Sequence, residues 1–422
     1  SLAPYLGTGL VDFGSGLVWD RRGEGPMNVD WEGKFSDRVE GLYGSMTRQL
    51  MSVLGDPEVI SFGGGLPAWD LFPIDQIRRV TDDLLCSDGP AALQYGTTEG
   101  YCPLREQLTE RQNKRGFDIT VDNVMIDTGT TQGIDLISKL FLDIDDGVVV
   151  GDPTFLTALQ AFSFYRARFL TLPLDEHGMR VELLPEILEK EKVKFIYVMP
   201  TFQNPTGQTL TLERRRRLLE IAEGHRVLVV EDDSYSDLRY EGEPLPPLKA
   251  LDRGGNVIYM GSFSKTLSPG LRVGFMVAPT PIMEKLVFVK QTADLHTSGL
   301  SQRIVHEFLR RDLLDSHVQH MSKTYLRRRN AMLTAMEHYF PREVRWTRPE
   351  GGIFLWVTLP SGMDAARLFE DAVAEKVVFV PGACYYADGG GENTMRLNFS
   401  AYTEEKIALG IQRLAKVIAR NR

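Results

Sequence analysis

Short apolar runs recur through the middle of this 422-residue chain, and stretches with helical periodicity separate them. Most of these runs are continuously apolar rather than alternating. Continuous runs indicate strands buried on both faces, as in a mostly parallel sheet. Seven of them predict strands, at residues 124–126, 148–150, 169–172, 195–199, 227–230, 257–260 and 273–277.

Helical periodicity between the runs completes the pattern. Ile134, Ile137, Leu140 and Phe141, for example, share one face of a predicted helix. Strands that alternate with helices predict an α/β fold. Residues 300–340 are predicted to form a long helix. After Pro341 the predicted elements are strands at 353–357, 377–380 and 395–399, closed by a helix from about residue 403.

The change of pattern divides the chain. A large domain at 75–309 is expected to hold the mostly parallel seven-stranded sheet. A smaller α+β domain is expected to combine residues 45–74 with 310–422. Residues 1–44 are predicted to be a flexible N-terminal arm, because their first part is rich in glycine and has no periodicity.

Composition narrows the classes of function. A net charge of -9 and a pI near 5.5 oppose a broad nucleic-acid surface. Sparse cysteines (Cys86, Cys102 and Cys384) fit a reducing compartment rather than a disulfide framework. We see no membrane-spanning apolar run and no signal peptide, so we expect a cytoplasmic protein. Scattered histidines without a third ligand predict no metal site.

Lys265 follows the predicted strand at 257–260 and has Ser262, Ser264 and Arg272 close by in the chain. A lysine at the end of a buried strand can lose part of its charge and become a nucleophile. Hydroxyl groups and an arginine are suited to a phosphate dianion. An amine that can form an imine beside a phosphate site predicts covalently held pyridoxal 5'-phosphate (PLP).

Three further polar segments also follow predicted strands, at residues 129–133, 204–207 and 231–235. Taken singly, these segments and Lys265 have ordinary explanations: a helix cap, a turn, a solvated acidic loop and an exposed charge. In open α/β sheets, ligands bind at the carboxyl ends of the strands. Their common position therefore predicts that all four meet in one crevice.

With these segments, the chain resembles the fold-type I, class I and II aminotransferases that use PLP. It is most similar to the branch with 2-aminoadipate, kynurenine (type II) and aromatic aminotransferases. The shared motifs lie at 63–67, 93–100, 204–207, 231–233 and 351–356. The resemblance implies an aspartate-aminotransferase-like fold, a homodimer with its site at the subunit interface, and small-molecule substrates without nucleic acid or membrane partners.

The resemblance also implies roles around the cofactor ring. Lys265 would form the internal aldimine, and Asp232 would face the pyridine nitrogen, keeping it protonated. Asn204 and Tyr235 would hydrogen-bond the phenolate oxygen of the ring. Phe155 stands where relatives often stack a tyrosine, and its aromatic face preserves the stacking.

Further implied roles concern the phosphate and the substrate. The phosphate would lie at a helix N-terminus, with contacts from Thr130, Thr131, Gln132, Ser262, Ser264 and Arg272. Tyr95 would reach the phosphate of the neighbouring subunit, although a core tyrosine before a turn is equally compatible with the sequence. Arg396 would grip the substrate carboxylate, and other substrate contacts would come from Asn204, Gly65, Leu66 and Arg48.

The expected reaction is a ping-pong transamination with 2-oxoglutarate, in which Lys265 moves the α-proton. The amino donor stays open between 2-aminoadipate, aromatic and branched-chain amino acids. Other PLP chemistry, a lyase or a synthase, is the main alternative. A serine acyl-enzyme at Ser262 lacks its companion motifs, and a DNA-binding regulator lacks room for a winged helix before the domain.

Overall fold

The computed structural model describes residues 18–19, 26–27, 32–39 and 56–421. Within these residues the larger sheet has eight strands in the order β4-β11-β10-β9-β8-β5-β6-β7. Its strands are β4 (Val124–Asp127), β5 (Gly147–Asp152), β6 (Arg168–Asp175), β7 (Gly178–Met179), β8 (Val193–Val198), β9 (Leu228–Asp233), β10 (Val257–Ser262) and β11 (Gly274–Val277).

Most of this sheet is parallel. Strands β6, β5, β8, β9 and β10 pair in parallel, and β11 runs antiparallel between β10 and β4. All seven predicted strands are confirmed, but the predicted number of strands is one too small. The additional strand, β7, has only two residues and returns antiparallel along β6 through Gly178, whose φ is 91°. A pair of residues is too short to give a hydrophobic pattern.

Apolar side chains on both faces of the larger sheet are buried in separate clusters. Along β5, Val148 and Val150 belong to one cluster and Val149 to the other. Strand side chains alternate between faces, so each cluster lies on one side of the sheet. Helices α4 (Thr130–Phe141) and α5 (Leu156–Phe164) contribute to the first cluster, and α7 (Leu212–His225) contributes to the second. Burial on both faces explains why the strands are continuously apolar.

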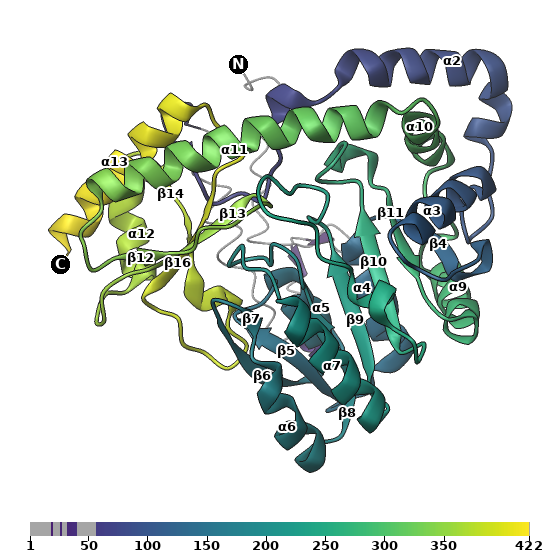
Figure 1. The fold of residues 1–422 in the computed structure, drawn as a ribbon, viewed down its shortest axis with the longest axis horizontal. Coiled ribbons are helices and arrows are strands. Elements are labelled where there is room, and N and C mark those ends of the chain that lie inside the picture. The colour runs from purple at the N-terminus through teal and green to yellow at the C-terminus, as the bar shows by residue number, and fades with distance from the viewer. Residues whose placement is uncertain (1–17, 20–25, 28–31, 40–55, 422) are drawn as a thin grey trace.

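The smaller sheet is formed by the C-terminal part of the chain (Figure 1). Its described strands lie in the order β12 (Arg345–Trp346), β13 (Phe354–Thr358), β16 (Thr394–Asn398) and β15 (Val380–Pro381). Nearby, β14 (Val377–Val378) pairs in parallel with β3 (Ile60–Ser61). The structure is therefore α/β with a larger, mostly parallel sheet and a smaller domain, as predicted.

Two long helices cross the smaller domain side by side, α11 (Leu313–Tyr339) and α13 (Glu404–Arg420) (Figure 1). The single long helix predicted over residues 300–340 is in fact α10 (Gly299–Arg310) followed by α11. Asp312 separates them with a left-handed φ of 54°, which stops the helix. The remaining helices are α2 (Ile74–Leu93), α3 (Cys102–Lys114), α6 (Leu184–Lys190), α8 (Leu248–Leu251), α9 (Thr280–Asp294) and α12 (Ala365–Ala374).

Parts of the predicted N-terminal arm are described. Strands β1 (Val18–Trp19) and β2 (Pro26–Met27) pair antiparallel, and two short 3-10 helices follow at Glu32–Lys34 and Asp37–Val39. The rest of the arm, and Arg48, lie outside the described residues. The flexibility of the arm and the residue limits of the two domains stay predictions.

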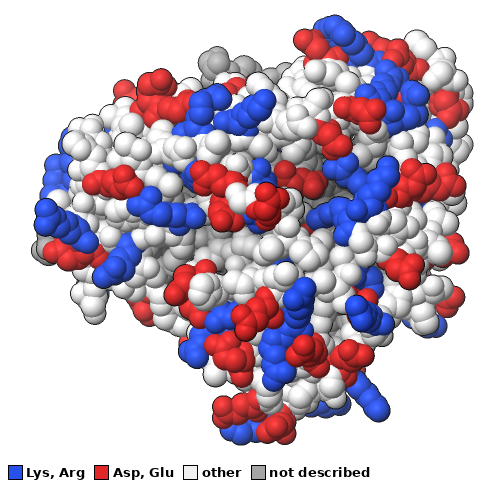
Figure 2. Space-filling model, in the orientation of Figure 1, with Lys and Arg blue, Asp and Glu red and all other residues white. Residues whose placement is uncertain are grey.

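Charge is spread evenly over the face seen in Figure 2, where acidic and basic side chains are intermixed. In the described part of the chain, no helix combines the length and the apolar character needed to cross a bilayer.

Arg215 on α7 anchors the loop that follows β8. Its guanidinium group is fully buried and donates to the carbonyl groups of Leu210, Pro200 and Pro246 and to the hydroxyl of Thr201. Arg215→Met would remove the donors of these acceptors, although the carbonyl of Pro200 would still accept from the amide of Leu210. We expect the variant to lower the free energy of unfolding by about 3 kcal/mol, measured from urea denaturation midpoints.

Arg217 on the same helix provides the control, because it is exposed and pairs with Glu220 at 3.2 Å. Arg217→Met should cost less than about 1 kcal/mol. Equal losses in the two variants would contradict the anchoring role of Arg215.

Candidate active site

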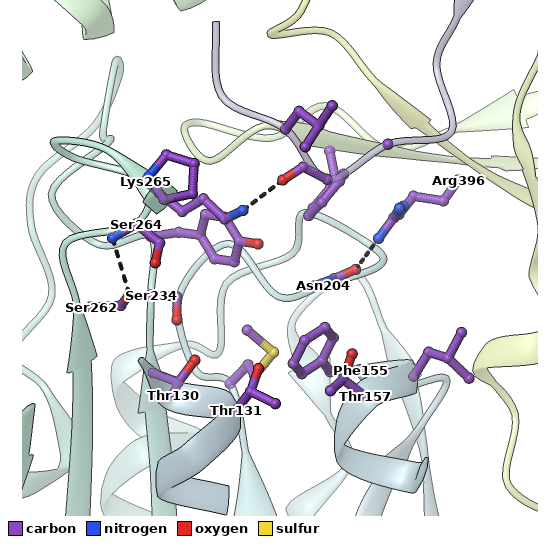
Figure 3. A pocket seen from close by; sticks show the side chains of 18 of the residues that line it. Thr130, Thr131, Phe155, Thr157, Asn204, Ser234, Ser262, Ser264, Lys265 and Arg396 are labelled. Atoms are coloured by element: carbon purple, nitrogen blue, oxygen red, sulfur yellow. Dashed lines mark hydrogen bonds between the residues drawn. The ribbon is translucent and has the colours of Figure 1, made fainter. Parts of the chain in front are cut away.

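A cavity of about 420 Å³ opens at the carboxyl ends of the parallel strands. The four predicted polar segments all contribute to its wall, together with residues from the smaller domain. The predicted site residues that line it are Gly65, Leu66, Thr130, Thr131, Phe155, Asn204, Asp232, Tyr235, Ser262, Ser264, Lys265, Arg272 and Arg396. Figure 3 shows Lys265 and Arg396 on one side of the cavity, with Thr130 and Thr131 at a helix start on the other.

Two of the predicted site residues do not line the cavity. The side chain of Gln132 is directed toward helix α9, where it donates to Asp294 and accepts from Lys290. Tyr95 is 77% exposed on the surface, with its ring against that of His296. A third predicted residue, Arg48, is outside the described part of the chain.

Lys265 follows β10 and extends into the cavity. Its Nζ donates to the carbonyl oxygen of Gly65 at 2.6 Å (Figure 3). Burial, together with the nearby positive charges of Arg396 and Arg272, lowers the pKa of Lys265 to about 8. The amine is therefore partly neutral near neutral pH, as a nucleophile or a proton acceptor must be.

Asp232 lies near the end of β9, buried beneath the cavity. Its Oδ2 accepts from the hydroxyl of Tyr197 at 2.8 Å and its Oδ1 from that of Ser234 at 2.9 Å. Burial raises the pKa of Asp232 to about 6, and the two hydroxyl donors oppose that rise. A buried carboxylate with neutral donors and no cation is suited to a cationic group in the cavity.

Arg396 extends from β16 of the smaller domain toward the loop after β8. Its guanidinium donates to Asn204 Oδ1 at 2.8 Å and to the carbonyl oxygen of Gly63 at 2.6 Å. The same group lies over the ring of Phe354, 4.1 Å from its centroid. Its Nε is buried without a hydrogen-bond partner among the described residues, which leaves one donor of the fork for an anion.

The turn before α4 forms the far wall. Gly129 has a φ of 99°, a conformation that favours glycine, and a Cβ there would lie 2.7 Å from Nη2 of Arg272 and displace its guanidinium group. Arg272 packs over the turn and donates to the carbonyl oxygen of Thr128 at 2.7 Å. The first amides of α4 lie beside the hydroxyls of Thr130 and Thr131, close to Arg272. Such a helix start is an anion site.

Several residues in or beneath the cavity were not predicted. Ser234 lies in one of the predicted polar segments, but no role was predicted for it. Tyr197 lies inside a strand that was predicted only from its apolar character. A tyrosine within a buried run signals a hydroxyl that needs a buried partner, here Asp232. Phe354 and Tyr385 line the cavity beside Arg396, but no feature of the sequence distinguishes them from aromatic residues of the core.

The arrangement fits PLP. The cavity combines a partly neutral lysine, a buried carboxylate without a cationic partner, and a helix start flanked by an arginine and hydroxyls. These are complementary to an aldehyde, a protonated pyridine nitrogen and a phosphate, respectively. Fold and site therefore define a PLP-dependent enzyme.

Comparison with known proteins identifies the family. The family "Aminotransferase class I and II" matches residues 57–414. An aromatic-amino-acid aminotransferase of Thermococcus litoralis is 45% identical over 397 residues, covering 92% of this chain and 95% of the relative. The chain thus belongs to the class I and II aminotransferases, and it is a PLP-dependent aminotransferase.

Solved structures agree over nearly the whole chain. The kynurenine aminotransferase of Pyrococcus horikoshii, in complex with PMP, has a TM-score of 0.89 at 44% identity and covers 93% of this chain and 98% of its own. The α-aminoadipate aminotransferase of Thermus thermophilus, complexed with N-(5'-phosphopyridoxyl)-L-leucine, has a TM-score of 0.87 at 41% identity and covers 93% and 99%.

The lowered pKa of Lys265 predicts the pH dependence of its labelling. A group with a depressed pKa loses its proton at lower pH, so acetylation of Lys265 in the apoprotein should be half-maximal near pH 8 rather than near 10.5. Competitive acetylation followed by peptide mass spectrometry measures this directly.

Lys190 is the internal reference, because its hydrogen bond with Glu186 raises its pKa. Labelling of Lys190 should therefore remain low at pH 8. If both lysines titrate together above about pH 10, the cavity does not desolvate Lys265.

Proposed function

We propose that this enzyme transfers the amino group of an L-amino acid of the 2-aminoadipate, aromatic or branched-chain type to 2-oxoglutarate, by a ping-pong mechanism. The observation that carries the proposal is the pairing, in one cavity, of the amine of Lys265 with the guanidinium of Arg396. One group can move a proton at the substrate α-carbon while the other holds the α-carboxylate.

Lys265 would hold the cofactor covalently in the resting enzyme, while other residues fix its position. Asp232 would face the pyridine nitrogen, Asn204 and Tyr235 the phenolate oxygen, and Phe155 the ring face. The phosphate would lie at the start of α4, with Thr130, Thr131, Gln132, Ser262, Ser264 and Arg272 around it. Gln132 contributes there through its place in the helix start, since its side chain is turned away. When bound, PLP withdraws electrons from the α-carbon of the amino acid.

Lys265 would then act as the general base and acid. With a pKa of about 8, its freed amine would take the α-proton and return it to the cofactor carbon that had carried the aldehyde. The carbonyl group of Gly65, which accepts from Lys265 Nζ at 2.6 Å, orients the amine between these positions. The same chemistry in reverse, with a second 2-oxo acid, completes the ping-pong cycle.

Arg396 would bind the α-carboxylate of both substrates. Asn204 fixes one arm of the guanidinium through its Oδ1, so the planar fork is already oriented toward the cavity. The unpartnered Nε supplies a further donor. A planar fork of this kind matches a carboxylate in two parallel bonds.

The donor side chain would extend toward Gly65 and Leu66, and Arg48 would contact it from the N-terminal segment. The described cavity lining includes the apolar side chains of Phe155, Leu156 and Phe354, which supports aromatic and branched-chain donors. The printed names of the relatives include aromatic and α-aminoadipate substrates. A panel of amino acids with 2-oxoglutarate, compared by kcat/KM, decides among them.

We also propose a homodimer with the site at the subunit interface. The exposed ring of Tyr95 would reach the phosphate of the neighbouring subunit. The three cysteines are unpaired, which supports a reducing, cytoplasmic environment.

Replacing Lys265 tests the mechanism. Lys265→Ala should lower kcat by about 10²–10⁴-fold, because no other amine lines the described part of the cavity. Borohydride treatment of the wild-type holoenzyme should fix the cofactor to the peptide that contains Lys265, as seen by mass spectrometry. Normal turnover of the variant, or label on another lysine, would remove Lys265 from this role. Release of a product other than the 2-oxo acid would instead favour a lyase or synthase.

Replacing Arg396 tests the carboxylate site. Arg396→Lys keeps the charge but loses the planar fork, so kcat/KM for phenylalanine should fall about 10²-fold. The matched comparison is phenethylamine, which lacks the carboxylate and should react equally slowly with both enzymes. A parallel loss for both amines would place Arg396 elsewhere in the mechanism.

A further inference from the structure

Lys290 is the one lysine of the described chain that ranks among its buried polar residues, and its side chain does not line the cavity. It lies on α9, with its side chain 0% exposed. Its Nζ donates to Asp294 Oδ1 at 2.8 Å, to Asp294 Oδ2 at 2.9 Å and to Gln132 Oε1 at 3.1 Å. The ammonium group thereby joins the end of α9 to the start of α4.

Gln132 links Lys290 and Asp294 to the turn before α4 through hydrogen bonds. Its Oε1 accepts from the amide of Thr128 at 2.8 Å, and its Nε2 donates to Asp294 Oδ2 at 2.7 Å. The hydroxyl of Thr128 donates to the same carboxylate oxygen at 3.1 Å. Lys290, Asp294 and Gln132 therefore hold one residue of the turn, Thr128, at its amide and at its hydroxyl. We call these three residues the brace.

The other polar groups of the turn are fixed from the opposite side. Arg272 donates to the carbonyl oxygen of Thr128 at 2.7 Å, and the amide of Gly129 donates to Asp127 Oδ1 at 2.8 Å. The carbonyl of Gly129 accepts from the amide of Gln132 at 2.8 Å. The amides of Thr130 and Thr131 have no such partner in the described structure, and both residues line the cavity.

We propose that Lys290, Asp294 and Gln132 are positioning residues that fix the turn so that the amides of Thr130 and Thr131 are presented to the cofactor phosphate. The inference rests on the proposed function, which locates the phosphate at this helix start. The side chains of the brace do not line the cavity. It sets the affinity for the phosphate half of PLP and leaves the reaction at the aldehyde unchanged.

The energetics support a geometric role. Burying the ammonium group of Lys290 costs several kcal/mol in desolvation, because its partner Asp294 is only partly buried, with 28% of its side chain exposed. An apolar side chain of similar volume would often be as stable. The hydrogen-bonded ion pair of Lys290 and Asp294 instead fixes the orientation of the Gln132 side-chain amide. Burial alone would raise the pKa of Asp294, but hydrogen bonds from Lys290, Gln132 and Thr128 hold it below its usual value. Asp294 is therefore charged at neutral pH, as the brace requires.

Comparing PLP with pyridoxal, which has the same aldehyde and no phosphate, isolates the effect. Each apoprotein is titrated with both compounds, and binding at Lys265 is followed by its absorbance. In Lys290→Met and Gln132→Leu, the half-saturating concentration of PLP should rise by about tenfold or more, the factor for one charge-assisted hydrogen bond. The half-saturating concentration of pyridoxal should change less than about twofold. Gln132→Leu keeps the ion pair between Lys290 and Asp294, so it remains informative if Lys290→Met fails to fold.

The control is another lysine–aspartate ion pair, Lys249 and Asp252. Its Nζ–Oδ2 distance is 2.9 Å, and its side chains are 11% and 3% exposed. Lys249→Met removes a comparable charge outside the cavity lining. The variant should bind both compounds with the affinities of the wild type. A selective loss of PLP affinity in the two brace variants alone supports the proposal. Unchanged PLP affinity, parallel losses of PLP and pyridoxal, or the same selective loss in Lys249→Met would overturn it.

The wild-type titration separates this inference from the function on which it rests. If wild-type apoprotein binds PLP no more tightly than pyridoxal, the phosphate does not lie at α4, and the proposed cofactor placement is wrong together with the brace. If the wild type strongly prefers PLP and the variants keep that preference, the placement stands and the brace alone is refuted.

Discussion

The desolvation of charged groups at one edge of the larger sheet is the constraint on which the site depends. Because the parallel strands end at the same edge, Asp232 and Lys265 are brought together from adjacent strands, and β9 and β10 are paired at Asp232 and Met260. Withdrawal from water raises the pKa of the carboxyl and lowers that of the amine. The pKa values of both groups are then close to neutral pH, so each group can exchange a proton with a bound ligand.

The smaller domain completes this environment. Arg396 comes from a strand of the second sheet, yet its guanidinium is fixed by Asn204 of the larger domain and by the carbonyl of Gly63 near the N-terminal strand β3. The proposed carboxylate site is therefore shared by three distant segments of the chain. A relative movement of the two sheets would change the distance between Arg396 and Lys265, and with it the fit of any amino acid.

Much of the fold could be predicted from the sequence because a strand buried on both faces leaves a continuous apolar run, as in β5, β8 and β10. What the sequence did not contain was information carried by single backbone angles. Asp312, with its left-handed φ, divides a helix that the periodicity presents as one. In the site, the positions of the strand ends predicted which residues lie together. They did not predict the direction of the Gln132 side chain, because a residue at the start of α4 can be directed either into the cavity or toward α9. Arg48 and the substrate contact expected from it lie beyond the described residues.

The pairing of β3 with β14 has a consequence for the order in which the chain can fold. Residue 60 pairs with residue 377, whereas the strands of the larger sheet all lie between residues 124 and 277. During synthesis the larger sheet can therefore be complete before β14, the partner of β3, has been synthesised. Until that partner emerges, Gly63, Gly64 and Gly65 are not held beside Lys265, so the catalytic pocket is among the last parts of the nascent protein to close.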